Sequence, residues 1–196
     1  MLSPQQLRDT LINVLDHAMP ACAEVEYRLV GTGAALLQGV LLPAGDIDIL
    51  VKEQAHVDAF GATLASYKCL FAPAWIPHGR QYYAEYEVNG VRVGFSTVEV
   101  ETESDGIECL GRGPWEHYVL VSCGLYAIPA VALELRLVSE LTRNRPDRYT
   151  PLIQHMQVNG CDTELVRRGM EAHGLAQALQ GKVLSQLGGA LANPGN

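Results

Sequence analysis

Two aspartates separated by one residue, Asp46 and Asp48, are the side chains of this chain best suited to metal chemistry. They begin an apolar run that predicts a strand over residues 46–51, and on a strand both carboxylates point to the same face. Aspartate is a poor strand former, so two of them in this run need a reason beyond structure. Neighbouring carboxylates repel each other, and Mg²⁺ or Mn²⁺ is a cation that neutralises them. The pair is therefore expected to bind a divalent metal.

A glycine-rich corner precedes this strand and adds a second kind of chemistry. Gly31, Thr32 and Gly33 follow a predicted strand over residues 25–30 and begin a short predicted helix. Such a corner presents free backbone N–H groups, which suit a phosphate. Each motif alone is commonly structural, either a tight strand–helix turn or solvated acids at a strand edge. Their combination favours metal-assisted phosphoryl or nucleotidyl transfer.

The order of these elements resembles the nucleotidyltransferase superfamily of DNA polymerase β type. Its signature is a strand, Gly-Ser or Gly-Thr, a helix, and Asp-x-Asp on the next strand, matched here by Gly31-Thr32 and Asp46-Ile47-Asp48. The likeness is best to small bacterial proteins related to the AbiEii toxin and to lincosamide or aminoglycoside nucleotidyltransferases. It covers roughly residues 25–155 and includes weaker features at Asn89-Gly90-Val91-Arg92-Val93, Ile128-Pro129 and Arg145-Pro146-Asp147.

The resemblance implies an α/β (α+β) fold with a twisted mixed sheet flanked by helices and followed by a helical segment. It also implies that Asp46 and Asp48 bind Mg²⁺ on the triphosphate of an NTP, for which ATP is the expected substrate. Gly31, Thr32 and Gly33 would hold the β- and γ-phosphates. A hydroxyl of a small molecule or protein would then attack the α-phosphorus and release pyrophosphate.

One position departs from the family pattern. The third carboxylate of the family sits on a central strand, and alignment from Asn89-Gly90 places Gly94 there. Glu99 and Glu101 lie further along, but their parity is opposite to that of Gly94, so only a bulge would bring Glu99 to the metal. Glu99 is nevertheless kept as a catalytic candidate. The alternative is a catalytically inactive nucleotidyltransferase-fold protein that binds nucleotide or a partner, in a toxin–antitoxin-like or regulatory pair.

Two cations could reach the triphosphate. Lys52 follows the aspartate strand, and Arg80 precedes a predicted hairpin. Either is also well explained as a solvated surface charge.

The sequence predicts an α/β core over residues 1–128, a helical segment over 129–187 and a flexible tail over 188–196. Ser3, Pro4 and Gln6 predict a capping box that begins an N-terminal helix. Further along we expect a helix over 54–70, a loop over 71–79, a hairpin over 81–100 turning at Asn89-Gly90, and a helix over 129–143.

Composition limits the partners. The 196 residues carry a formal net charge of −8 without a Lys/Arg run, which argues against an extended nucleic-acid surface. Uninterrupted apolar runs are shorter than a membrane span needs, and the N-terminal residues lack a secretion signal, so a cytoplasmic protein is expected. Five scattered cysteines indicate reduced thiols. A homo-oligomer or a partner protein is compatible with the sequence.

Overall fold

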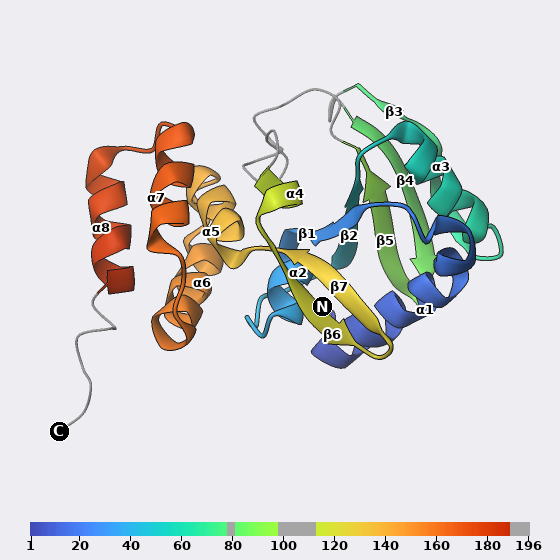
Figure 1. Cartoon of the computed structure of the whole chain (residues 1–196), viewed down its shortest axis with the longest axis horizontal. Coiled ribbons are helices and arrows are strands. Elements are labelled where there is room, and N and C mark those ends of the chain that lie inside the picture. The colour runs from blue at the N-terminus through green and yellow to red at the C-terminus, as the bar shows by residue number, and fades with distance from the viewer. Residues whose placement is uncertain (78–80, 98–112, 189–196) are drawn as a thin grey trace.

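The two strands that flank the glycine corner lie side by side near the middle of one mixed sheet (Figure 1). The computed structural model describes residues 1–77, 81–97 and 113–188. The strands are β1 (Tyr27–Val30), β2 (Asp46–Val51), β3 (Lys68–Ile76), β4 (Gln81–Val88), β5 (Val91–Ser96), β6 (Tyr118–Cys123) and β7 (Tyr126–Val131). The helices are α1 (Pro4–Cys22), α2 (Gly31–Leu37), α3 (Gln54–Thr63), α4 (Gly113–Glu116), α5 (Leu133–Thr142), α6 (Pro146–Asn159), α7 (Thr163–Ala172) and α8 (Gln177–Gly188).

The strand order across the sheet is β3-β4-β5-β2-β1-β7-β6. Strand β2 runs antiparallel to β1 and parallel to β5, and β1 runs parallel to β7. The sheet is therefore mixed, as the sequence predicted, and β2 has a neighbour on each side.

Burial separates the two faces of the central strands. Residues of one parity pack with α1 and α3 in the core, where Leu29, Ile47, Ile49 and Phe95 are at most 1% exposed. Residues of the other parity include both aspartates of β2, which are half-buried. The alternation is what a strand with one core face requires, and it sends the two carboxylates to the face opposite that core.

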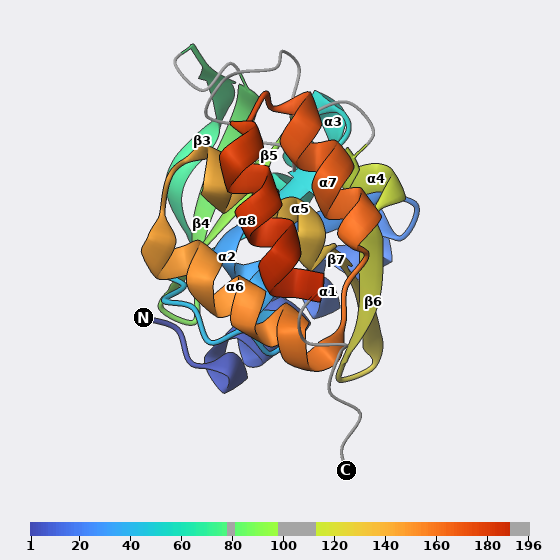
Figure 2. The same cartoon turned by 90° about the vertical axis from the view of Figure 1, so that its left-hand side faces the viewer.

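Helices α5 to α8 form a bundle beside the sheet, drawn in orange and red in Figure 1. Helix α5 packs on α2, α6 and α7, and α8 packs on α6 and α7. Figure 2 looks onto this bundle, with α6, α7 and α8 toward the viewer and α5 behind them. The bundle therefore reaches the glycine corner through α2.

Several local predictions are confirmed. Ser3 and Gln6 form the capping box that begins α1, and β2 has the predicted bounds. The Asn89-Gly90 turn has positive φ at both residues, 55° and 75°, as a two-residue hairpin turn needs.

Two predicted segments were wrong. The expected helix over 54–70 ends at Thr63, and residues 68–76, expected as helix and loop, form β3 at the edge of the sheet. An edge strand tolerates proline, and Pro73 falls within a register irregularity between Phe71 and Ala74.

The expected helix over 129–143 begins later, at Leu133, because residues 129–131 continue β7. The pairing of β1 with β7 centres on Leu29 and Ala130, so the missing N–H of Pro129 interrupts little of that ladder. The predicted boundary between residues 128 and 129 falls inside β7. Of the predicted flexible tail, only Gly188 lies within the described residues, as the end of α8.

None of the helices in the described ranges is both long enough and apolar enough to cross a membrane.

Candidate active site

Asp46 and Asp48 share one face of β2, as their spacing predicted. Asp48 pairs with Val30 of β1 on one side and with Gly94 of β5 on the other. Asp46 pairs with Arg92 of β5. The end of β1 and the beginning of β2 thus meet at the start of α2, and this junction is the candidate site.

Gly31 lies directly against the Asp48 carboxylate. Its φ is +66°, a left-handed conformation that favours glycine. A Cβ atom built at this position would overlap the Asp48 carboxylate oxygen Oδ2. Glycine is required here for two separate reasons, its backbone conformation and the space taken by Asp48. The carboxylate of Asp48 therefore sits at the first residue of α2.

Thr32 connects this junction to the helical bundle. Its side chain is buried, and its hydroxyl oxygen accepts a hydrogen bond of 2.5 Å from Nη1 of Arg148. Arg148 comes from the first turns of α6 and is only 18% exposed, with Asp147 3.9 Å from its Nε. A guanidinium group, which binds phosphate well, is therefore held at the glycine corner.

The neighbouring strands add charged and polar groups on the face of the aspartates. Arg92 donates from Nε to the Glu85 carboxylate at 2.7 Å, and Glu85 is 7% exposed. This hydrogen bond is the main reason that the pKa of Arg92 is raised, and the charge of Asp46 adds to it. Arg92 thus carries its positive charge between two acidic side chains, Glu85 and Asp46.

Tyr83 of β4 also lies near this group. Its pKa is raised, first by burial and then by the negative charges of Glu85 and Asp48. Burial and these two neighbouring acids therefore keep the phenol protonated at neutral pH.

Two carboxylates beside a glycine corner fit the way proteins hold Mg²⁺. That ion usually keeps several waters and takes one or two carboxylates together with substrate phosphates. Within the described ranges, histidine, cysteine, aspartate and glutamate side chains form no group of three that could hold a metal. The Asp46 and Asp48 carboxylates therefore fit a Mg²⁺ ion that takes its remaining ligands from water or a bound substrate.

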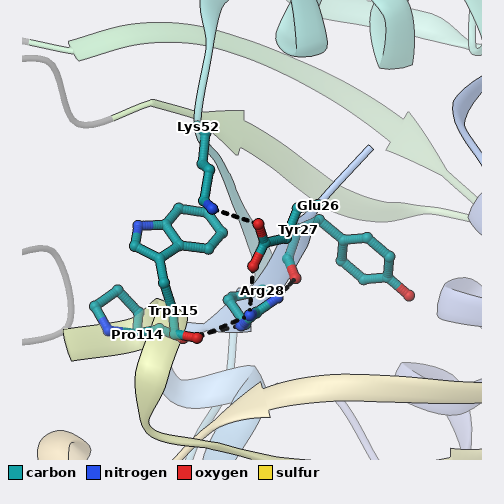
Figure 3. A network of polar contacts seen from close by, with 6 residues as sticks. All are labelled: Glu26, Tyr27, Arg28, Lys52, Pro114 and Trp115. Carbon is teal, nitrogen blue, oxygen red and sulfur yellow. Dashed lines mark hydrogen bonds and ion pairs between the residues drawn. The ribbon is translucent and has the colours of Figure 1, made fainter. Parts of the chain in front are cut away.

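Lys52 is not brought to this junction. Because β1 and β2 are antiparallel, the end of β2 lies beside the start of β1, where Lys52 pairs with Glu26 (Figure 3). Glu26 also binds the buried Arg28, which donates to the backbone oxygens of Pro114 and Trp115. Lys52 is four positions beyond Asp48 along the chain, roughly 13 Å of extended backbone. Lys52 belongs to the contacts that anchor α4 to β1.

Arg80 and Glu99 fall outside the described residues, and their roles stay predictions. Gly94 lies beside Asp48, where the alignment expected the third acid.

Four residues of the site were missed from the sequence: Tyr83, Glu85, Arg92 and Arg148. The Asn-Gly turn could have revealed Glu85, because a two-residue turn pairs Val88 with Val91 and so fixes the partners along the hairpin. That register places Glu85 opposite Gly94. Arg148 had no such signal, since it is 116 residues from Thr32.

Comparisons with known proteins find similarity in solved structures. The chain matches no family model and no curated protein sequence. The structure of TM1012 from Thermotoga maritima, described as a candidate nucleotidyltransferase, is similar with a TM-score of 0.55 and 16% identity. The match covers 81% of this chain and 96% of TM1012. JHP933 from Helicobacter pylori gives a TM-score of 0.42 and 11% identity, over 97% of this chain and 91% of that one.

The structure of Cid1 in complex with its short product ApU gives a weaker match. Its TM-score is 0.30 at 16% identity, over 48% of this chain and 29% of Cid1. The likeness to TM1012 shows a shared fold, a mixed α/β sheet with C-terminal helices. At this level of identity it concerns the fold, and activity must be argued from the site.

Proposed function

We propose that this protein is a Mg²⁺-dependent nucleotidyltransferase. It would transfer a nucleoside monophosphate from an NTP, with ATP as the expected substrate, to a hydroxyl of a small molecule or protein. The observation that carries the proposal is the packing of the Asp48 carboxylate against Gly31 at the start of α2, with Asp46 on the same face. This arrangement supports one site for both a metal and a phosphate.

Asp46 and Asp48 would hold the metal. When bound, Mg²⁺ would offset the negative charge of the triphosphate and of the leaving pyrophosphate. Both aspartates are half-buried, so their carboxylates are held by the strand yet remain accessible to a ligand. Asp48 is fixed further by its contact with Gly31.

Thr32 and Arg148 would bind the β- and γ-phosphates. The Thr32 hydroxyl and the Arg148 guanidinium already contact each other, so a phosphate oxygen at this corner would meet a hydroxyl and a cation together. A charge-assisted hydrogen bond from arginine is among the stronger protein contacts to phosphate. Because Arg148 belongs to α6, nucleotide binding would also link the sheet to the helical bundle.

The second candidate function is nucleotide or partner binding without transfer. The glycine at position 94 favours it, because the described residues supply two carboxylates at the site and no clustered third. The two functions share the metal and phosphate contacts and differ in whether the α-phosphate is transferred.

The experiment that tests the proposal is incubation of the protein with α-³²P-labelled NTPs and Mg²⁺ or Mn²⁺. We expect metal-dependent release of pyrophosphate and label on an acceptor, and both should be lost in Asp48→Asn. Asp9→Asn is the matched control, because Asp9 lies on α1 and accepts a hydrogen bond from Gln5. Transfer that continues unchanged in Asp48→Asn would refute the proposed function. Metal-dependent nucleotide binding by the wild type without transfer would favour the second candidate function.

A further inference from the structure

Three residues from three neighbouring strands form a row on the face of the site. Asp48 of β2 pairs with Gly94 of β5, and Gly94 pairs with Glu85 of β4. All three positions point to the same face because paired residues share it. The middle position of the row has no side chain, which leaves space between the two acids.

Tyr83 fills that space. It pairs with Ser96 in the next row, but its side chain leans over Gly94. A Cβ atom at position 94 would lie 2.8 Å from the Tyr83 hydroxyl oxygen and 3.0 Å from its ring carbon Cε2. Glycine at 94 thus makes room for the Tyr83 phenol, and any larger residue would displace it. The position without a carboxylate is occupied by a hydroxyl from the adjacent strand.

A buried acid lies on the same face as the hydroxyl. Glu85 is two residues from Tyr83 on β4, and its charge adds to the effect of burial in raising the pKa of the phenol. The Glu85 side chain is 10% exposed and is held by Arg92, with Nη2 2.6 Å from its Oε1. A phenol that donates its proton to a carboxylate still has lone pairs that accept another hydrogen bond. The hydroxyl over Gly94 is also close to the metal-binding pair, because Gly94 pairs with Asp48 on the neighbouring strand.

Resting on the function proposed above, we infer that Tyr83 binds the acceptor hydroxyl and that Glu85 receives its proton through Tyr83. The acceptor O–H donates to the Tyr83 oxygen while Tyr83 donates to Glu85. As the acceptor oxygen bonds to the α-phosphorus, the bond from that phosphorus to the bridging oxygen breaks and pyrophosphate leaves. The acceptor proton moves to Tyr83, the Tyr83 proton moves to Glu85, and Glu85 later releases it to water.

This arrangement assigns a role to the glycine that departs from the family pattern. A carboxylate at position 94 would face the acceptor directly, whereas here a hydroxyl faces it and the acid stands behind. The accepted substrate class is an alcohol, because its O–H can donate to the phenol oxygen.

The test compares two neighbouring tyrosines. Tyr83→Phe removes the hydroxyl at Gly94, and Tyr82→Phe is the matched control, because Tyr82 donates 3.0 Å to Asp58 of α3. Glu85→Gln is the second variant. Pyrophosphate release from MgATP is measured with glycerol as a simple alcohol acceptor, together with the Kd for MgATP and a thermal melt.

We expect Tyr83→Phe and Glu85→Gln to lower kcat about 100-fold, the usual range for a lost proton-transfer group. The Kd for MgATP should change less than about twofold in each, because metal and phosphate contacts remain. The control Tyr82→Phe should melt as the wild type does and keep its kcat. The same result for Tyr83→Phe and Glu85→Gln would overturn this inference and leave the proposed function standing. A wild-type protein that releases no pyrophosphate would instead refute catalytic transfer, and this inference with it.

Discussion

Replacing Gly31 with alanine should damage the site more than the fold. Gly31 has a φ of +66°, and Gly90 in the hairpin turn has a φ of +75°. A left-handed conformation costs a non-glycine residue roughly 1–2 kcal/mol. For a protein of this size each kcal/mol lowers Tm by roughly 2–4 °C, so both alanine variants should lose about 2–8 °C.

The two glycines differ in their surroundings. A Cβ at Gly31 would overlap the Asp48 carboxylate, whereas a Cβ at Gly90 meets nothing within 4 Å. Moving a side chain about 30° off its rotamer adds roughly 0.5–1.5 kcal/mol, so Gly31→Ala should be the less stable variant.

The assay is equilibrium binding of MgATP to both variants. Gly31→Ala should weaken binding at least tenfold, about 1.4 kcal/mol, because Asp48 must move. Gly90→Ala should bind as the wild type does. Equal affinity of the two variants and the wild type would refute the link between Gly31, Asp48 and the nucleotide.

Three further outcomes are expected. Arg148→Ala should weaken MgATP binding about 10- to 100-fold, as loss of a charged hydrogen bond does. Lys52→Ala should leave the Kd for MgATP unchanged, because Lys52 pairs with Glu26 away from the site. Equal changes of Kd in the two variants, measured by titration with MgATP, would contradict this. Glu140→Ala should lower the free energy of unfolding in urea by about 3–5 kcal/mol, because it leaves the 2% exposed Arg136 without its fully buried partner. The double variant Arg136→Met/Glu140→Leu should lower it less, because neither charge then remains buried. A double variant as unstable as the single one would argue against a desolvation effect. Burial raises the pKa of the Cys22 and Cys123 thiols, so a maleimide should label the exposed Cys69 before either of them in peptide maps. Early labelling of Cys22 would count against this packing.

The parts of the fold that the sequence predicted depend on local chemistry. The capping box at Ser3, the Asn89-Gly90 turn and the bounds of β2 are each set by residues close in the chain. The alternation of acids and apolar residues in β2 predicted which face the acids occupy, and burial confirms it.

The parts that it missed depend on distant contacts. Strand β3 has no regular alternation and contains a proline, so nothing local separated it from a loop. Arg148 reaches Thr32 because α5 packs on both α2 and α6, which brings the start of α6 to the glycine corner. Lys52 looked close to the aspartates in sequence, but the antiparallel pairing of β1 and β2 places it at the other end of the strand.

The site itself was predicted in part. The registers of β2, β5 and β4 show that the row from Asp48 through Gly94 ends at Glu85, with Tyr83 over the glycine. The position of Glu99 was judged from the alternation of side chains along one strand. That alternation cannot reveal a carboxylate on the neighbouring strand. A pairing argument across the hairpin would have found Glu85.

The most direct test of the central claim is a calorimetric titration of ATP into the protein, with Mg²⁺ and again with EDTA. We expect saturable binding that requires Mg²⁺, that falls at least tenfold in Asp48→Asn, and that is unchanged in Asp9→Asn. Binding of equal strength with EDTA, or in Asp48→Asn, would contradict a metal–nucleotide site at the junction of β1, β2 and α2.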